Sequence, residues 1–208
     1  MQKTRDKTEP IGETVRVFVA IELPQTVADT LAAVIDELRR ASIAELRLMR
    51  PEGVHLTLKF LGDVEPDRLK AIEAAVGRVA EAHACFSLGL GEPGAFPGGA
   101  DARVLWIDLR GDLEPLQALQ RDVEESLEAL GFGRDRREFS PHLTLARLRD
   151  RASKAERRRA VEALASINID SRYAIDVRTI SLMQSTLHPD GAAYKRLASI
   201  PLGRGNSA

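Results

Sequence analysis

The chain repeats one tetrapeptide, first as His55-Leu56-Thr57-Leu58 and again as His142-Leu143-Thr144-Leu145. Two of the four histidines in the 208 residues therefore stand in identical local surroundings. A single histidine with a threonine two residues later is an ordinary feature of the polar face of a sheet. Two copies, each with leucine at both other positions, indicate that the tetrapeptides act together, and we treat them as one unit.

Each tetrapeptide has the pattern of a half-buried β-strand. Residues i and i+2 of a strand project to one face of the sheet, and residues i+1 and i+3 project to the other. The histidine and threonine of each copy therefore share a face, and the two leucines point into an apolar layer on the opposite side. We expect the imidazole and hydroxyl groups to stand on the wetter face of the sheet.

The composition is that of an ordinary globular protein, with 44% hydrophobic and 29% charged residues. A formal net charge of −1 argues against a protein that holds long nucleic acid by bulk attraction, although a basic cleft would still bind one phosphate or a short end. The single cysteine, Cys85, excludes an intramolecular disulfide and any multi-cysteine metal site. Since no apolar run reaches the ~18 residues that span a bilayer, we expect a cytoplasmic protein without a membrane segment.

The hydrophobic pattern predicts alternating strands and helices. In the first half we expect a strand at 15–22, a helix at 24–41, the first motif strand at 54–61, a helix at 66–82, and apolar strands at 86–90 and 104–109 joined by a Gly/Pro-rich loop at 91–99. In the second half we expect a helix at 113–130, a basic loop at 134–137, the second motif strand, a helix at 154–165, and strands at 174–184 and 194–201 linked by a tight turn at 188–191.

The two motifs occupy equivalent places in this order, because each strand follows a predicted helix. This placement suggests two related lobes that each bring one His-x-Thr strand to a common cleft. We expect a single bilobal domain over residues 14–202, with flexible tails at 1–13 and 203–208.

Two imidazoles and two hydroxyls in one cleft suit the chemistry of phosphoryl groups. Histidine titrates near neutrality, so one ring can accept a proton while the other donates one in the same turnover. Threonine hydroxyls can donate hydrogen bonds to nonbridging phosphoryl oxygens and stabilise charge that shifts during displacement. The paired motifs therefore predict phosphoryl transfer by acid–base catalysis.

Tandem His-hydrophobic-Thr-hydrophobic motifs define the 2H phosphoesterase superfamily, which this chain resembles. The segments most similar to its RNA 2′,3′-cyclic phosphodiesterases, historically called 2′-5′ RNA ligases, are 16–24 (RVFVAIELP), 54–62 (VHLTLKFLG), 104–106 (VLW), 140–147 (SPHLTLAR) and 185–194. The resemblance implies an α+β fold of two pseudo-symmetric lobes, each a largely antiparallel sheet with helices on its outer face, around a central water-filled cleft. It also implies no cofactor and no metal requirement.

The resemblance further implies roles for particular residues. His55 would donate a proton to the departing 3′ oxygen, and His142 would activate the water that attacks phosphorus, so that the product is a 2′-phosphomonoester. Thr57 and Thr144 would hold the phosphate. Arg147 resembles the substrate-contacting arginine of the family, but three residues beyond Thr144 a regular strand would point it to the other face. A bulge or a strand end would aim Arg147 at the cleft, and the alternative is a structural ion pair.

Three aromatic residues near the motifs are candidates for stacking on the terminal base: Phe18, Phe60 and Phe139. The alternative for each is a place in the core, which is also what we expect of Trp106 in its apolar strand. The basic runs at 134–137 and 157–159 are expected to be solvated faces. The expected partners are RNA ends or small nucleotides that carry a cyclic phosphate, bound by a monomer.

Other functions are compatible with the motif at this point. The same pocket could close or open a 2′-5′ linkage, or process a cyclic phosphate on a nucleotide such as an ADP-ribose derivative. A noncatalytic RNA-end-binding protein has no need of two proton-transfer groups, so product formation separates it from an enzyme. A metal-dependent hydrolase is disfavoured because no HExxH or clustered Asp/His set accompanies the motifs.

Overall fold

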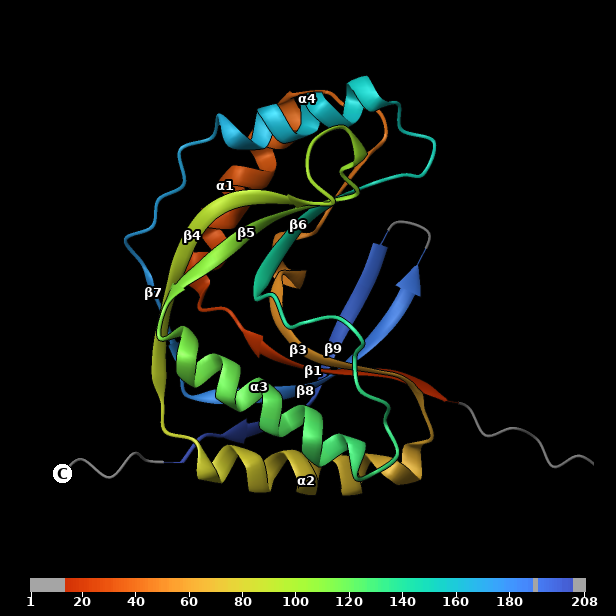
Figure 1. Ribbon diagram of the computed structural model, residues 1–208, viewed down its shortest axis with the longest axis vertical. Coiled ribbons are helices and arrows are strands. Elements are labelled where there is room, and N and C mark those ends of the chain that lie inside the picture. Colours follow the sequence, from red (N-terminus) through yellow and green to blue (C-terminus); the bar gives the residue numbers. More distant parts are fainter. Residues whose placement is uncertain (1–13, 189–190, 204–208) are drawn as a thin grey trace, which may run out of the picture.

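The computed structural model describes residues 14–188 and 191–203 (Figure 1). The first half contains β1 (Val15–Glu22), α1 (Gln25–Arg40), β2 (Leu46–Leu48), β3 (His55–Val64), α2 (Leu69–Ala82) and β4 (Phe86–Phe96), with the short 3₁₀ turns η1 (Pro51–Gly53) and η2 (Pro66–Arg68). The second half contains η3 (Gly99–Asp101), β5 (Val104–Gly111), α3 (Leu113–Glu128), β6 (His142–Leu148), α4 (Lys154–Ala165), β7 (Ala174–Val177), β8 (Thr179–His188) and β9 (Gly191–Pro201).

Most predicted elements are present, and the clearest error is the loop predicted at 91–99. β4 continues through Phe96 and pairs with β5, with a register shift between Leu90 and Pro93. Pro93 is tolerated inside a strand because a bulge removes the need for a regular ladder hydrogen bond at that point. The short strand β2 and the early start of β9 were also not predicted.

The predicted turn and tails lie partly outside the described residues. β8 and β9 form the expected hairpin, with His188 opposite Gly191, while residues 189–190 are outside. The predicted tails at 1–13 and 204–208 are outside as well. Gly203, which we had assigned to the tail, instead makes a β-bridge with Ala84.

The strands form one curled antiparallel sheet, which has nine strands within the described residues. Its order is β7-β4-β5-β6-β3-β1-β8-β9, with β2 beside β6. Within the described chain β3 and β6 pair at one point, Leu56 opposite Leu143. We call this point the seam; it separates a first half-sheet of β3, β1, β8 and β9 from a second half-sheet of β6, β5, β4, β7 and β2.

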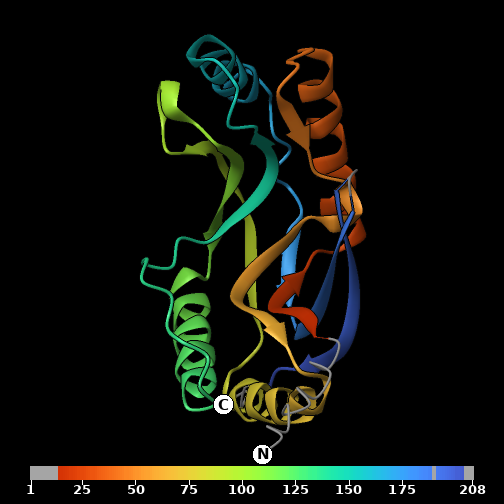
Figure 2. The same ribbon diagram turned by 90° about the vertical axis from the view of Figure 1, so that its right-hand side faces the viewer.

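Two helices cover the outer face of each half-sheet (Figures 1 and 2). α2 contacts β8 and β9 and α3 contacts β3, whereas α1 contacts β2 and β6 and α4 contacts β4 and β5. α1 follows β1 but lies on the second half-sheet, and α3 follows β5 but contacts the first. Each of these helices therefore crosses the seam and ties the two halves together. The predicted α+β fold of two related lobes with helices outside is confirmed.

The apolar faces of helices and strands meet in one hydrophobic core that spans both halves. The buried stripe of α1 follows the helical spacing read from the sequence (Val27, Leu31, Val34, Ile35 and Leu38). All four motif leucines belong to the same core and are at most 3% exposed (Leu56, Leu58, Leu143 and Leu145). Each buried leucine contributes about 2 kcal/mol to folding, so the core fixes the backbone of both motif strands.

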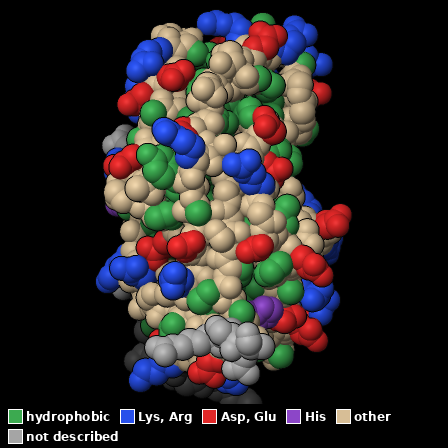
Figure 3. Space-filling model, turned by 90° about the vertical axis from the view of Figure 1, so that its left-hand side faces the viewer, with side chains coloured by type: hydrophobic (Ala, Val, Ile, Leu, Met, Phe, Trp, Pro, Cys, Tyr) green, Lys and Arg blue, Asp and Glu red, His purple; other side chains and the backbone are tan. Residues whose placement is uncertain are grey.

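The surface on the side of β4 and β7 carries charges of both signs (Figure 3). Lys and Arg side chains gather along its upper end, where α4 lies, and acidic side chains are interspersed below them. In the part of the chain that the structure describes, no helix is long and apolar enough to cross a membrane.

One arginine of α4 is buried, contrary to the prediction of a solvated run. Arg157 is 7% exposed, and its guanidinium donates hydrogen bonds of 2.5–3.1 Å to the carbonyl oxygens of Ala102, Arg149, Asp150 and Ala152. These carbonyls lie just before β5 and just after β6. Arg157 therefore joins the ends of two central strands to α4.

Replacing Arg157 with alanine should destabilise the fold, because several buried carbonyl oxygens lose their donor. We expect the free energy of unfolding, measured by urea denaturation, to fall by about 3 kcal/mol. The exposed neighbour Arg158 is the control, and Arg158→Ala should change it by less than about 0.5 kcal/mol. Equal effects of the two substitutions would contradict this account of Arg157.

Candidate active site

The seam between β3 and β6 brings the two tetrapeptides together. Because the first leucines of the two motifs face each other in antiparallel register, His55 is set across from Thr144 and Thr57 across from His142. All four side chains are half-buried and leave the sheet on the inner face, opposite the buried leucines. The two motifs therefore form one cluster of two imidazoles and two hydroxyls.

Each motif strand carries a β-bulge directly after its threonine. The pairing of β3 with β1 skips Leu58, and the pairing of β6 with β5 skips Leu145. An extra residue in a strand reverses the alternation of the side chains that follow it. As a result, Phe60 and Arg147 are exposed on the same face as the histidines.

The bulge in β6 decides between the two orientations left open for Arg147. The side chain shares the inner face with His142 and Thr144 and does not point to the opposite side. Its charge also acts on the phenol of Tyr194 in β9, which belongs to the first half-sheet. Arg147 therefore faces across the seam and is within reach of an anion held there.

The two histidines are oriented by the same hydrogen bond. Nδ1 of His55 lies 2.7 Å from the carbonyl oxygen of Gly53, and Nδ1 of His142 lies 2.7 Å from the carbonyl oxygen of Ser140. A carbonyl oxygen only accepts, so each Nδ1 carries the proton and donates it. This arrangement fixes each ring and leaves Nε2 as the atom that exchanges protons with a ligand.

Aromatic rings enclose His55 on the side of the first half-sheet. Phe18 stacks on the imidazole with ring centroids 4.6 Å apart, and Tyr194 meets it edge-on at 5.0 Å. Phe18 and Tyr194 also contact each other. Tyr194 was not among the predicted site residues, because its neighbourhood depends on the curl of β9 over β1, which has no local sequence signal.

A second aromatic pair lies beside His142. Phe96 meets this imidazole edge-on at 5.1 Å and stacks on Trp106 at 4.6 Å, and Trp106 lies 6.1 Å from His142. A Cβ built on Gly94 would stand 2.2 Å from the indole ring, so the ring lies flat across that glycine. The prediction that Trp106 is a core residue was wrong: it is half-buried on the inner face. Phe96 was missed because it fell in the predicted loop.

The three predicted stacking residues have different environments. Phe18 is fully buried and is covered by His55, Phe60 and Tyr194, so it supports the site and offers no open face. Phe139 packs against the main hydrophobic core, so its assignment as a base-stacking residue was wrong. Phe60 is 60% exposed on the inner face.

The two histidines differ in their surroundings. Burial lowers the pKa of His55 below its ordinary value of 6.5, while the hydrogen bond to the carbonyl of Gly53 and the charge of Glu22 act in the opposite direction. The neutral form of His55 is therefore favoured in the folded protein. A lowered histidine pKa adds stability that is complete above pH ~6.5 and is lost as the pH falls through the folded-state value.

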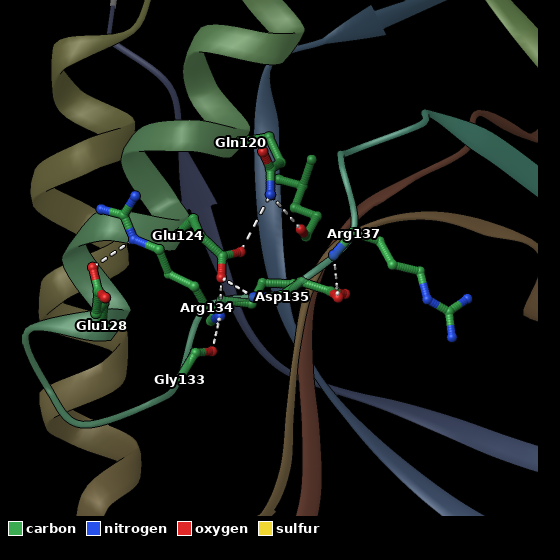
Figure 4. A network of polar contacts seen from close by, with 9 residues as sticks. Gln120, Glu124, Glu128, Gly133, Arg134, Asp135 and Arg137 are labelled. Carbon is green, nitrogen blue, oxygen red and sulfur yellow. Dashed lines mark hydrogen bonds and ion pairs between the residues drawn. The ribbon is translucent and has the colours of Figure 1, made fainter.

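A buried ion pair fastens the segment that leads into β6. Lys59 is 5% exposed, and its Nζ donates to Oε1 of Glu124 at 2.5 Å and to the carbonyl of Gly133 at 2.9 Å. Glu124 also accepts from the backbone N–H of Asp135 at 2.8 Å and from the amide of Gln120 at 3.3 Å (Figure 4). Lys59 directly follows the β3 bulge. One motif strand therefore holds the approach to the other.

The basic loop at 134–137 contributes to the same region. Arg134 pairs with Glu128 at 2.6 Å, and Figure 4 shows its side chain on the side of α3. The side chain of Arg137 points away from the network in Figure 4. Among the residues that the structure describes, no group of three or more His, Cys, Asp or Glu side chains is arranged to hold a metal ion.

Known proteins resemble the chain over most of its length. A profile described as the 2′-5′ RNA ligase superfamily matches residues 27–187. The chain is 31% identical over 182 residues to the RNA 2′,3′-cyclic phosphodiesterase of Archaeoglobus fulgidus, which covers 88% of this chain and 97% of that protein. It is 30% identical over 180 residues to the protein of the same name from Methanothermobacter thermautotrophicus, with coverage of 86% and 95%.

Solved structures share the fold. Escherichia coli LigT complexed with 3′-AMP superposes with a TM-score of 0.68 at 26% identity, covering 91% of this chain and 99% of that chain. The apo form of LigT superposes with a TM-score of 0.73 at 24% identity, covering 93% and 100%.

Removing one partner of the Lys59–Glu124 pair should cost more stability than removing both charges. We expect Lys59→Met to lower the free energy of unfolding by about 3 kcal/mol, because the carboxylate of Glu124 stays buried without its cation. The double variant K59M/E124Q should recover at least about 1 kcal/mol of this loss in urea denaturation. Purely additive losses would show that the two side chains do not act as a pair.

Proposed function

The chain belongs to the 2′-5′ RNA ligase superfamily, and on that basis we propose that it hydrolyses the 2′,3′-cyclic phosphodiester at an RNA end to a 2′-phosphomonoester. The relatives named RNA 2′,3′-cyclic phosphodiesterase indicate the substrate. The observation that carries the proposal is the register of the seam, which places both His-x-Thr pairs on one face of the sheet with each Nε2 directed away from its backbone acceptor.

The four motif side chains and Arg147 bind the cyclic phosphate in this proposal. Thr57 and Thr144 donate hydroxyl hydrogen bonds to the nonbridging oxygens, one from each half-sheet. Arg147 adds a positive charge and charge-assisted hydrogen bonds from the second half-sheet. Because these donors stand on separate strands, the phosphate is held at the seam and not on either half alone.

The two histidines exchange protons on opposite sides of phosphorus. Nε2 of His142 takes a proton from water as the water oxygen forms its bond to phosphorus, and Nε2 of protonated His55 gives a proton to O3′ as the P–O3′ bond breaks. The products are a 2′-phosphomonoester and a free 3′ hydroxyl, and each ring ends in the protonation state opposite to its starting one. Proton exchange with solvent resets both rings.

The environment of His55 suits a proton donor. Burial lowers the pKa of His55, which makes its protonated form a stronger acid toward a departing alkoxide. The same burial reduces the fraction of the ring that is protonated at neutral pH. The dianion that develops at the bound phosphate and a nearby carboxylate offset this loss.

The inner face offers contacts for the nucleoside that carries the phosphate. Phe60 is exposed beyond Thr57, and Tyr194 stands half-buried beside His55. Stacking on such rings tolerates any base, so we propose RNA ends or small nucleotides as substrates, without selection by sequence. All residues of this site come from one chain, and we propose that the protein acts as a monomer, in the cytoplasm.

Each catalytic histidine should be required for turnover. With a short oligonucleotide ending in a 2′,3′-cyclic phosphate, we expect His55→Ala and His142→Ala each to lower kcat about 10²-fold or more at neutral pH. Initial rates and the position of the product phosphate are measured chromatographically. A product carrying the phosphate at 3′, or near-normal rates in both variants, would overturn the proposal.

Two controls make this experiment specific. His83 lies at the end of α2, where its Nε2 pairs with Asp122 at 2.9 Å, and His83→Ala should keep the wild-type rate. Turnover should also be unchanged in excess chelator, because the proposed chemistry uses proton transfer and hydrogen bonds. Loss of activity in chelator would point instead to a metal-dependent hydrolase.

Arg147 should contribute to phosphate binding. We expect Arg147→Ala to lower kcat/KM for the cyclic phosphate about 10-fold or more, with Arg147→Lys retaining part of the effect because it keeps the charge but loses the planar fork. Arg78→Ala, an exposed arginine on α2, is the charge-matched control. A normal kcat/KM for Arg147→Ala would return Arg147 to a structural role.

A further inference from the structure

Each motif histidine faces a carboxylate on the neighbouring strand. In the pairing of β1 with β3, Glu22 stands opposite His55, and in the pairing of β5 with β6, Asp108 stands opposite His142. Directly opposite residues of an antiparallel pair project to the same face with Cβ atoms about 5 Å apart. The tetrapeptides contain no acidic residue, so this feature appears only when the strands are paired.

Glu22 is held in place on the inner face. It lines a cavity of about 270 Å³ together with His55, Met183 and Tyr194. Its two carboxylate oxygens each lie 3.4 Å from Nη1 of Arg196, which comes from β9. The ion pair links the outer strand of the first half-sheet to the strand beside His55, and it keeps the carboxylate of Glu22 ionised and oriented.

The charged and titratable groups around His55 come from several elements. Glu22 faces it from β1, with Arg196 of β9 behind that carboxylate. Tyr194 of β9 meets the ring edge-on, and Glu52 of η1 and Asp29 of α1 line the same cavity. Arg147 approaches from β6, near Tyr194. Of the surrounding acidic groups, Glu22 is the one set directly opposite the imidazole by the strand register.

We propose that Glu22 is a positioning residue for His55: its carboxylate, anchored by Arg196, faces the imidazole and favours the protonated ring. Burial disfavours a charged imidazole, and a neighbouring negative charge opposes that cost. The carboxylate acts through His55 and does not touch the phosphate. Its part in turnover, which is to keep a proton on His55 for the departing oxygen, rests on the proposed function.

The two carboxylates are not equivalent. Asp108 is exposed, and its Oδ1 accepts a hydrogen bond from the backbone N–H of Leu109. Its partner His142 lies in a more exposed part of the inner face than His55 does. A charge acts more strongly where less water surrounds it. Glu22 therefore has the larger effect on its histidine, and the pair of sites becomes asymmetric at this point.

The direct test is the titration of His55 in the free protein by NMR of imidazole-labelled histidine. We expect Glu22→Gln to lower the pKa of His55 by about half a pH unit or more, and Glu22→Asp to restore most of the difference. Glu52→Gln, which neutralises a carboxylate of the same cavity, and Asp108→Asn should leave it within about 0.2 pH units. An unchanged pKa in Glu22→Gln, or the same shift in Glu52→Gln, would overturn the proposal.

Kinetics separate a positioning role from a structural one. In Glu22→Gln, kcat/KM for the cyclic phosphate should fall about 3- to 10-fold at pH 8 and approach the wild-type value toward pH 6, because the rate loss follows deprotonation of His55. A loss that is equal at every pH would indicate a structural effect and contradict the proposal. The NMR titration needs no substrate, so it decides the role of Glu22 even if the wild-type protein does not hydrolyse cyclic phosphates.

Discussion

The site depends on one contact, the antiparallel pairing of β3 and β6 at Leu56 and Leu143. Two half-sheets that met along a full ladder would form a flat sheet with a closed inner face. Because these strands meet at one point among the described residues and then diverge, the sheet curls and the side chains beside the contact remain accessible. The buried leucines on the outer side fix the register. A shift of one residue would turn the histidines and threonines into the core.

The same local devices appear on both sides of this contact. Each histidine donates Nδ1–H to the carbonyl two residues before it, and each strand has a bulge directly after its threonine. What differs is the residue that each bulge exposes, an aromatic ring at Phe60 and a cation at Arg147. A symmetric frame therefore carries asymmetric groups, which suits a reaction that needs an acid on one side of phosphorus and a base on the other.

The sequence predicted the repeated strands, the burial of their leucines and the shared face of histidine and threonine, because these follow from the two-residue period of a strand. It did not predict the neighbours contributed by other strands. Tyr194 reaches His55 through the curl of β9, and Phe96 reaches His142 because β4 continues where glycines and prolines suggested a loop. Arg157 was assigned to the surface by composition, whereas carbonyl oxygens from distant segments make its burial favourable. Such contacts depend on tertiary pairing and leave no local signal.

The central claim is that His55 and His142 act on one phosphorus atom at the seam. The most direct measurement is a crystal structure of the protein with a nucleoside 2′-phosphate, the proposed product, bound. The account predicts that Nε2 of both histidines lies within about 3.2 Å of oxygens of the same phosphate or of the adjoining O3′. A phosphate bound away from the seam, or contacted by one imidazole while the other is separated from it by packed side chains, would contradict the account.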